Sequence, residues 1–177
     1  MVFVALPALQ RSQRDTQRRN DLSRVDTSLV QYQTNNQGTN GGFNLPAGPN
    51  YFDAATGHTT GRRSAAKEFV HRYMNSGVDE SEINTFQDPD GTLYNLYISE
   101  NLSSSKSFST HVGAAKLQST GEKSYTIASD FDDHIIYIIP GARCNGGSVT
   151  VDTVRHFAVL YRLEGAGTYC IDDQWKE

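Results

Sequence analysis

The sequence predicts an α+β fold in which one long N-terminal helix packs on an antiparallel β-sheet head. Apolar residues recur at gaps of 3, 4 and 3 from Leu22 to Tyr32, which is the spacing of one helix face. Residues 135–139 are apolar throughout and precede Pro140-Gly141, as expected of a strand that is buried on both faces. Loops, and not helices, separate the expected strands of the second half, which favours antiparallel pairing with the helix on one face.

The chain of 177 residues is long enough for one domain with its own core. We divide it into a helix, residues 1–37, and a head, residues 38–177. Hydrophobic residues make up 37% of the chain, and 20 acidic against 16 basic residues give a formal net charge of −4. This balance argues against a nucleic-acid-binding protein.

The predicted helix has three zones. The first, up to Leu9, is apolar on every side, and it is far shorter than the roughly 20 residues that span a bilayer. The second, from Gln10 to Asp21, contains no large apolar residue. The third carries the face that should pack on the head, formed by Leu22, Val25, Leu29 and Tyr32. Asn35, Asn36 and Gly38 then favour a helix end.

The length of this helix predicts that part of it projects from the head. A helix over residues 1–37 would extend about 50 Å, whereas a domain of this size is only about 40 Å across. The first two zones should therefore need another partner. One interpretation is a tip that is buried among copies of the same helix, and the other is a loose terminus that happens to be apolar.

Charge is divided unevenly between helix and head. Residues 10–26 contain five arginines and three aspartates, a net +2, which leaves 11 basic and 17 acidic residues, a net −6, for the rest. A basic helix and an acidic head could attract each other between neighbouring copies. The alternative is a set of ordinary pairs three or four residues apart within the helix, worth only about 0.2–0.5 kcal/mol each.

The opening of the chain resembles a known family. Ala5-Leu6-Pro7-Ala8-Leu9-Gln10, followed by a polar and basic helix that becomes amphipathic, is similar to the N-terminal helix of type IV pilins, which carries an Ala-x-Pro element. The run that begins at Pro7 most resembles pilins of ultrasmall episymbiotic bacteria. The resemblance implies a pilin-like fold and filament packing through the helix; the candidate packing residues are Val2, Phe3, Val4, Leu6, Pro7, Leu9, Arg11, Arg14, Arg18 and Arg19.

The chain departs from this family at its start. Type IV pilins begin with a cleavage-site glycine, then Phe-Thr-Leu-Ile-Glu and an apolar run that anchors the subunit in the inner membrane before assembly. None of these precedes residue 5 here. We expect a shortened N-terminus, a misassigned start or a chain without this processing, and a membrane stage only if the missing segment exists in the cell.

Two cysteines, Cys144 and Cys170, lie in the β-rich end. They could be free thiols, but in a head rich in Ser, Thr, Asn and Gly we expect a disulfide, which implies an oxidising, extracytoplasmic location. Closing a loop of this length should stabilise the fold by about 3.5 kcal/mol. Residues 144–170 resemble the C-terminal disulfide loop of pilins. Two isolated cysteines without nearby histidines are a poor zinc ligand set.

Residues 38–61 are predicted to form a loop, because six glycines, Pro46 and Pro49 stand among them. In pilins this place belongs to the variable region. Residues 64–75 should form a short helix that Gly77 ends. We expect strands at 92–99, 157–163 and 168–171, and residues 111–120 fit no single prediction.

Asp88-Pro89-Asp90-Gly91 has the residues of a type I turn. The functional alternative is a calcium site with Asp88 and Asp90 as ligands, although a full EF-hand loop would need further acids. A similar Asp-Pro-x-Gly followed by Tyr occurs in type II secretion pseudopilins, where the region binds calcium. This segment therefore supports the main alternative family.

The sequence contains no motif for catalysis. No Gly-x-Ser-x-Gly elbow and no His-x-x-x-His spacing occurs, so we expect no enzyme and no cofactor. We expect the structural subunit of a type IV pilus on the cell surface, serving adhesion, twitching motility or DNA uptake. Its partners would be the same or minor pilin subunits, the pilus assembly machinery, and a host-cell or abiotic surface. The alternatives are a type II secretion pseudopilin and a monomeric secreted binding domain whose loop at 38–61 holds a ligand.

Overall fold

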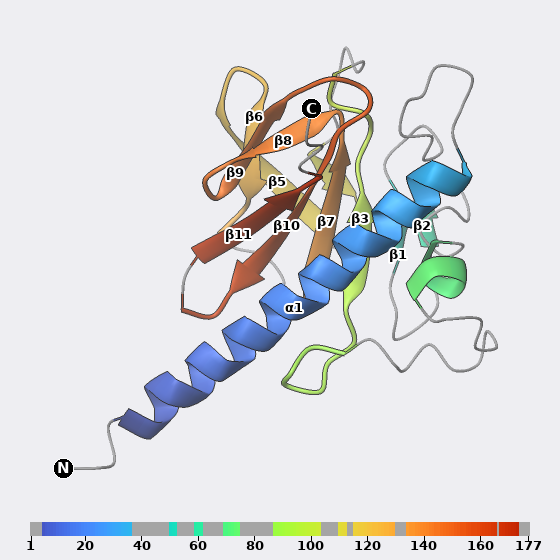
Figure 1. The fold of residues 1–177 in the computed structure, drawn as a ribbon. Coiled ribbons are helices and arrows are strands. Elements are labelled where there is room, and N and C mark those ends of the chain that lie inside the picture. The colour runs from blue at the N-terminus through green and yellow to red at the C-terminus, as the bar shows by residue number, and fades with distance from the viewer. Residues whose placement is uncertain are drawn as a thin grey trace.

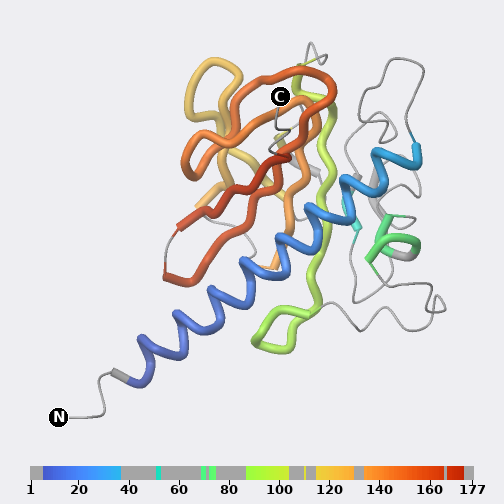
Figure 2. The backbone as a smooth tube through the Cα atoms, in the orientation of Figure 1, coloured from blue at the N-terminus to red at the C-terminus, as the bar shows by residue number. Residues whose placement is uncertain are grey.

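The computed structural model describes residues 5–36, 50–52, 59–61, 69–74, 87–103, 110–112, 115–129, 134–165 and 167–173. These residues form three layers: helix α1, a six-stranded sheet and a five-stranded sheet. Helix α1 runs diagonally across the head, and its N-terminal end extends beyond the strands (Figures 1 and 2). The predicted α+β class is confirmed.

Helix α1 (Ala5–Asn35) contains 31 residues, which corresponds to a length of about 46 Å. Its end matches the expected stop, because both the backbone N–H and the side-chain amide of Asn36 donate to the carbonyl of Tyr32. On the face of the helix that is turned to the head, Leu22, Val25 and Leu29 are fully buried, and Tyr32 packs against the same cluster. The predicted head-packing face is therefore in contact with the head.

The six-stranded sheet has the order β11-β10-β7-β3-β1-β2. Its strands are β1 (Asn50–Phe52), β2 (Thr59–Gly61), β3 (Asn95–Ile98), β7 (Ile135–Pro140), β10 (Phe157–Leu163) and β11 (Gly167–Asp172). The prediction of a purely antiparallel sheet is wrong, because β3 pairs with β7 in parallel. Parallel neighbours need a long crossover, and here it contains β4, β5 and β6 of the other sheet.

The five-stranded sheet has the order β4-β5-β6-β9-β8 and antiparallel pairing throughout. Its strands are β4 (His111–Val112), β5 (Ala115–Gly121), β6 (Ser124–Ile127), β8 (Ala142–Asn145) and β9 (Ser148–Val151). The β8–β9 hairpin was not predicted, although the Gly-Gly pair at its two-residue turn is a hairpin signal. Gly146 adopts a φ of 62° there, which a residue with a side chain rarely takes.

The central strand β7 separates two hydrophobic clusters. Ile136 and Ile138 face the cluster under α1, whereas Ile135, Tyr137 and Ile139 face the cluster between the two sheets. Neighbouring β10 alternates in the same way, with Val159 and Tyr161 towards α1. All six residues of β7 are buried, so the prediction of a strand covered on both faces is confirmed.

A disulfide joins Cys144 on β8 to Cys170 on β11, as predicted. It connects the five-stranded sheet to the edge of the six-stranded sheet. The backbone N–H of Cys144 also donates to the Asp172 carboxylate at 2.8 Å. The edge strands β8 and β11 of the two sheets are thus held together by a covalent bond and a hydrogen bond.

The segment after α1 differs from its prediction. The expected loop at 38–61 contains β1 and β2, which pair with each other and add to β3; its residues 38–49 and 53–58 lie outside the described ranges. Tyr51 and Phe52 supply the apolar contacts that hold this strand pair. Of the helix expected at 64–75, the structure describes Phe69 and a turn of π-helix, η1 (Val70–Met74), packed on α1.

Candidate functional site

The N-terminal end of α1 has no cover from the head. Side chains 6–13 are all exposed, and we call residues 5–13 the helix arm. Leu6 is 50% exposed and Leu9 is 57% exposed. At about 100° per residue, both leucines lie on the side of the helix opposite Leu22 and Leu29. The other predicted tip residues, Val2, Phe3 and Val4, lie outside the described ranges.

Directly after the arm, the head-packing face continues with charged residues. Asp15 and Arg18 lie seven and four positions before Leu22, so they share its face. Only 5% of Asp15 and 3% of Arg18 is exposed. The polar middle of the helix was predicted to project, and for these two residues that prediction is wrong.

Arg18 is the centre of a buried network. Its Nε and Nη2 donate to the two oxygens of Asp88 at 2.7 Å each, a bidentate pair. Its Nη1 donates to Asp15 and its Nη2 also donates to Glu164, both at 3.2 Å. Hydrogen bonding to Asp88 raises the pKa of Arg18 above its ordinary value despite burial. The guanidinium therefore remains charged and joins three carboxylates.

The Asp88 turn supplies the main partner. Gly91 N–H donates to the Asp88 carbonyl at 2.8 Å, which closes the turn that the sequence predicts. The hydroxyl of Tyr161 donates to Asp88 Oδ2 at 2.7 Å, and burial raises the pKa of this tyrosine, so its proton stays in place. Burial disfavours the Asp88 carboxylate, but the hydrogen bonds from Arg18 and Tyr161 outweigh it and hold its pKa below the ordinary value.

The β10–β11 turn approaches the helix at the same level. Backbone N–H groups of Glu164 and Gly165 donate to the two oxygens of Asp15 at 3.0 and 3.1 Å. Arg14 binds the Glu164 carboxylate through Nε and Nη2, with a shortest contact of 2.7 Å. One turn of the helix thus holds both the backbone and the side chain of this hairpin tip. We call the six residues Arg14, Asp15, Arg18, Asp88, Tyr161 and Glu164 the helix clamp.

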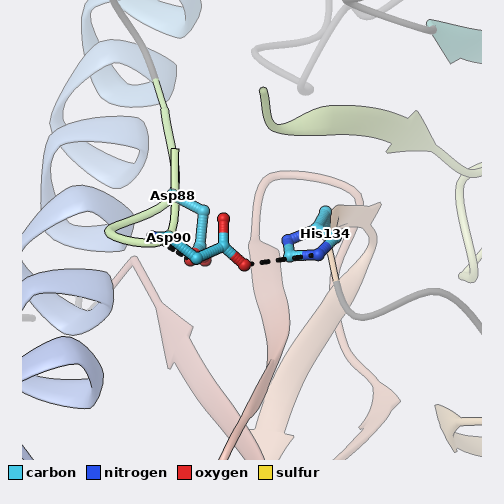
Figure 3. A group of neighbouring side chains, drawn as sticks. All are labelled: Asp88, Asp90 and His134. Carbon is cyan, nitrogen blue, oxygen red and sulfur yellow. Dashed lines mark hydrogen bonds and ion pairs between the residues drawn. The ribbon is translucent and has the colours of Figure 1, made fainter. Parts of the chain in front are cut away.

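The clamp bears on the predicted calcium site. Asp88, Asp90 and His134 do lie together, and an Asp90 oxygen is 3.6 Å from His134 Nε2 (Figure 3). Asp88 Oδ1 accepts from Arg18 and from the Asp90 N–H, and Oδ2 accepts from Arg18 and Tyr161. A carboxylate has about four lone-pair sites, and all four are used here beside a cation. Asp88 could ligate calcium only by leaving the clamp.

Three of the arginines predicted for filament packing contact the head of their own chain. Arg14 and Arg18 belong to the clamp, and the Arg19 guanidinium lies 5.5 Å from the ring centre of Tyr169. For Arg14 and Arg18, the attraction that was expected between the helix and the acidic head of different copies therefore acts within one molecule. The sequence did not indicate this because Asp88 and Glu164 are 70 and 146 positions from Arg18. Arg11, in the arm, is exposed.

Sequence reasoning did not select Asp15, Tyr161 or Glu164. For Asp15 a signal existed, because the 3- and 4-residue spacing of Leu22, Val25 and Leu29 extends back to residues 18 and 15. The pattern is easily overlooked because buried helix positions are usually apolar and charged residues are seldom fully buried. For Tyr161 and Glu164 no local pattern exists, since their role depends on which turn the sheet brings to the helix.

No family model, curated protein or solved structure showed significant similarity to this chain. Within the described ranges, no helix combines the length and the apolar content needed to cross a bilayer.

Proposed function

We propose that this protein is a structural subunit of a type IV pilus and that it polymerises through α1. The observation that carries the proposal is the helix arm, which extends beyond the head with Leu6 and Leu9 about half exposed. Covering a leucine that is half exposed contributes about 1 kcal/mol, so a helix–helix contact that covers both is favourable. Its sequence resemblance to the pilin helix supports this reading.

The rest of the molecule is consistent with such a role. The C-terminal half of α1 is part of the head's core, so the head and the assembling helix are one unit. The disulfide between Cys144 and Cys170 suits an oxidising, extracytoplasmic location. In this proposal the partners are further copies or minor subunits and the assembly machinery, and the head faces outward towards a surface. The role needs no cofactor.

The geometry favours this proposal over a type II secretion pseudopilin. That alternative depends on calcium binding by Asp88 and Asp90. Both carboxylate oxygens of Asp88 already accept hydrogen bonds from Arg18, Tyr161 and a backbone N–H. Tight calcium binding that competes with the Arg18 contact would reverse the preference. A monomeric binding domain would show no dependence on the helix arm.

The test is immunogold electron microscopy of cells that make the protein, with antibody raised against the head. We expect label along surface filaments, and we expect the double change Leu6→Asp and Leu9→Asp to abolish them while secreted protein stays folded. Val154→Asp is the matched control, since Val154 is an exposed apolar residue, at 39%, in the head. Dispersed label in the unmodified strain, or filaments that persist in the double variant, would refute the proposal.

A further inference from the structure

Helix α1 is attached to the head by two different kinds of contact. Leu22, Val25 and Leu29 bury apolar side chains on the six-stranded sheet. The two turns before them are held instead by the helix clamp, in which Arg18 and Asp88 are 3% and 2% exposed. An apolar residue at position 18 would extend the same core, so attachment of the helix alone does not explain why an ionic contact stands there.

A buried ion pair is weak evidence for stability. Removing two charges from water costs several kcal/mol, and replacement by apolar residues is often neutral or stabilising. What ion pairs supply better is geometry: a bidentate guanidinium–carboxylate contact accepts one orientation, whereas leucines can slide over one another. The best-attested use of buried polar groups is to fix one arrangement among several of similar energy.

The clamp has the form needed to fix an orientation. Arg18 contacts two separate turns, the one at Asp88 and the one at Glu164, and in Figure 1 these turns lie on either side of the helix. Asp15 binds two backbone N–H groups of the second turn, so this contact does not depend on side-chain rotamers of the head. A helix held from two sides resists a swing in either direction.

We propose that Arg18 is a positioning residue that fixes the direction in which the helix arm leaves the head. Where the protein assembles as proposed above, that direction also sets how the head of one subunit is spaced from the next. The effect on subunit spacing rests on the proposed function, whereas the effect on the direction of the arm does not.

The lever is long enough for a small tilt to matter. Leu6 lies 16 residues from Leu22, which corresponds to about 24 Å along the helix. With the clamp open, the first firm contact is at Leu22, and a tilt of about 15° moves Leu6 by roughly 6 Å, more than half of an interhelical distance. With the clamp closed, the lever starts at Arg14 and is about 12 Å long.

The direct test measures the arm in the monomer. Spin labels at Leu9→Cys in the arm and Glu122→Cys at the β5–β6 turn, both exposed, report their distance by pulsed electron paramagnetic resonance. We expect a narrow distribution for the parent and a distribution several ångströms wider for Arg18→Met. Arg18→Lys keeps the charge but not the bidentate contact, so its distance distribution should be narrower than that of Arg18→Met and wider than that of the parent. Arg24→Met, which removes an exposed arginine of the same helix, should change nothing.

A second readout separates orientation from stability. Hydrogen exchange should speed up for amides 14–21 in Arg18→Met and stay the same for amides 25–33, whose turns pack on the core. If Arg18→Met does not fold, Glu164→Ala removes the part-exposed carboxylate that Arg14 and Arg18 share, keeps the backbone contacts of Asp15, and should widen the distribution less. An arm as narrowly distributed in both variants as in the parent would overturn the proposal.

The two proposals can fail separately. Filaments of the Arg18→Met protein should form but show irregular subunit spacing by electron microscopy. A wider arm distribution in a protein that never forms filaments would support the clamp and refute the pilus role. Regular filaments together with an unchanged arm distribution in Arg18→Met would support the pilus role and refute the positioning role of the clamp.

Discussion

At the scale of single residues, the charges of Arg18 and Asp26 on one side of the helix differ in whether they have partners. Arg18 is buried with three carboxylate partners, so its charge is matched. Asp26 lies one turn beyond Leu22, and its Oδ1 is buried with no hydrogen-bond partner among the described residues. Burial, with repulsion from Asp173 and Asp172, raises the pKa of Asp26 to about 6. A carboxylate in this position disfavours the fold when ionised.

Asp26→Asn should therefore stabilise the protein at neutral pH. The pKa of Asp26 rises on folding from 3.8 to about 6, so its protonated form favours the fold below pH 3.8 and this benefit is lost as the pH rises through about 6. Allowing for solvent screening, we expect the variant to gain about 1 kcal/mol at pH 7.5 and little at pH 3.5. Urea unfolding at both pH values measures the difference.

The control for this change is Glu122→Gln, which neutralises an exposed carboxylate at the β5–β6 turn. It should leave the pH dependence as it is in the parent. An Asp26→Asn protein that gains the same stability at both pH values would show that charge on Asp26 is not the cause.

At the scale of elements, α1 is one continuous helix with two unlike halves. Its C-terminal half is held by fully buried apolar residues, and in its N-terminal arm side chains 6–13 are exposed. The clamp lies between them. The helix spacing of Leu22, Val25 and Leu29 was enough to locate the packed half, because a single face recurs every three or four residues.

The two halves should respond differently to the same substitution. Leu29→Asp places an unpaired carboxylate in the core under α1 and should cost about 3–5 kcal/mol, enough to unfold many domains of this size. Leu9→Asp adds a charge to a residue that is 57% exposed and should change stability by less than about 0.5 kcal/mol. Thermal unfolding followed by circular dichroism compares them. A similar loss for both would mean that the arm packs on the head in solution.

At the scale of the whole molecule, two hydrophobic clusters join the helix and the two sheets, and a few specific links add to them. The β3–β7 pair joins the strand pair β1–β2 to the rest of the six-stranded sheet, and the disulfide closes the opposite edge. The five-stranded sheet is thereby held against the other at β8 and β11. On its other face the six-stranded sheet is covered by α1, and η1 packs beside the helix in the same hydrophobic cluster.

Removing the disulfide should weaken the molecule without changing its architecture. Cys144→Ala with Cys170→Ala opens a loop with a sequence separation of 26, which should cost about 3.5 kcal/mol in the chain-entropy model. Equilibrium urea unfolding of the double variant gives the loss directly. The circular dichroism spectrum of the folded state should stay the same, and an unchanged unfolding midpoint would contradict the stabilising role.

Several elements have local causes and were therefore predictable from the sequence: the long helix and its packed face, the strand buried on both sides, the turn at Asp88 and the disulfide. These follow from periodicity, turn residues and cysteine context, all of which act within a few residues or require only two positions. Short strands such as β8 and β9 were less visible, because their outer face is polar and each has four residues.

Two features were not predictable from the sequence: the parallel pairing of β3 with β7 and the contacts of the helix arginines with the head. Both depend on which distant segments meet, and contacts between residues 40 to 150 positions apart leave no periodic trace in the chain. The same basic side chains could have paired with a neighbouring copy or with their own head, and composition is equal in the two cases. In this fold Arg14, Arg18 and Arg19 contact their own head. The turns that carry Asp88 and Glu164, and the strand that carries Tyr169, lie beside the helix.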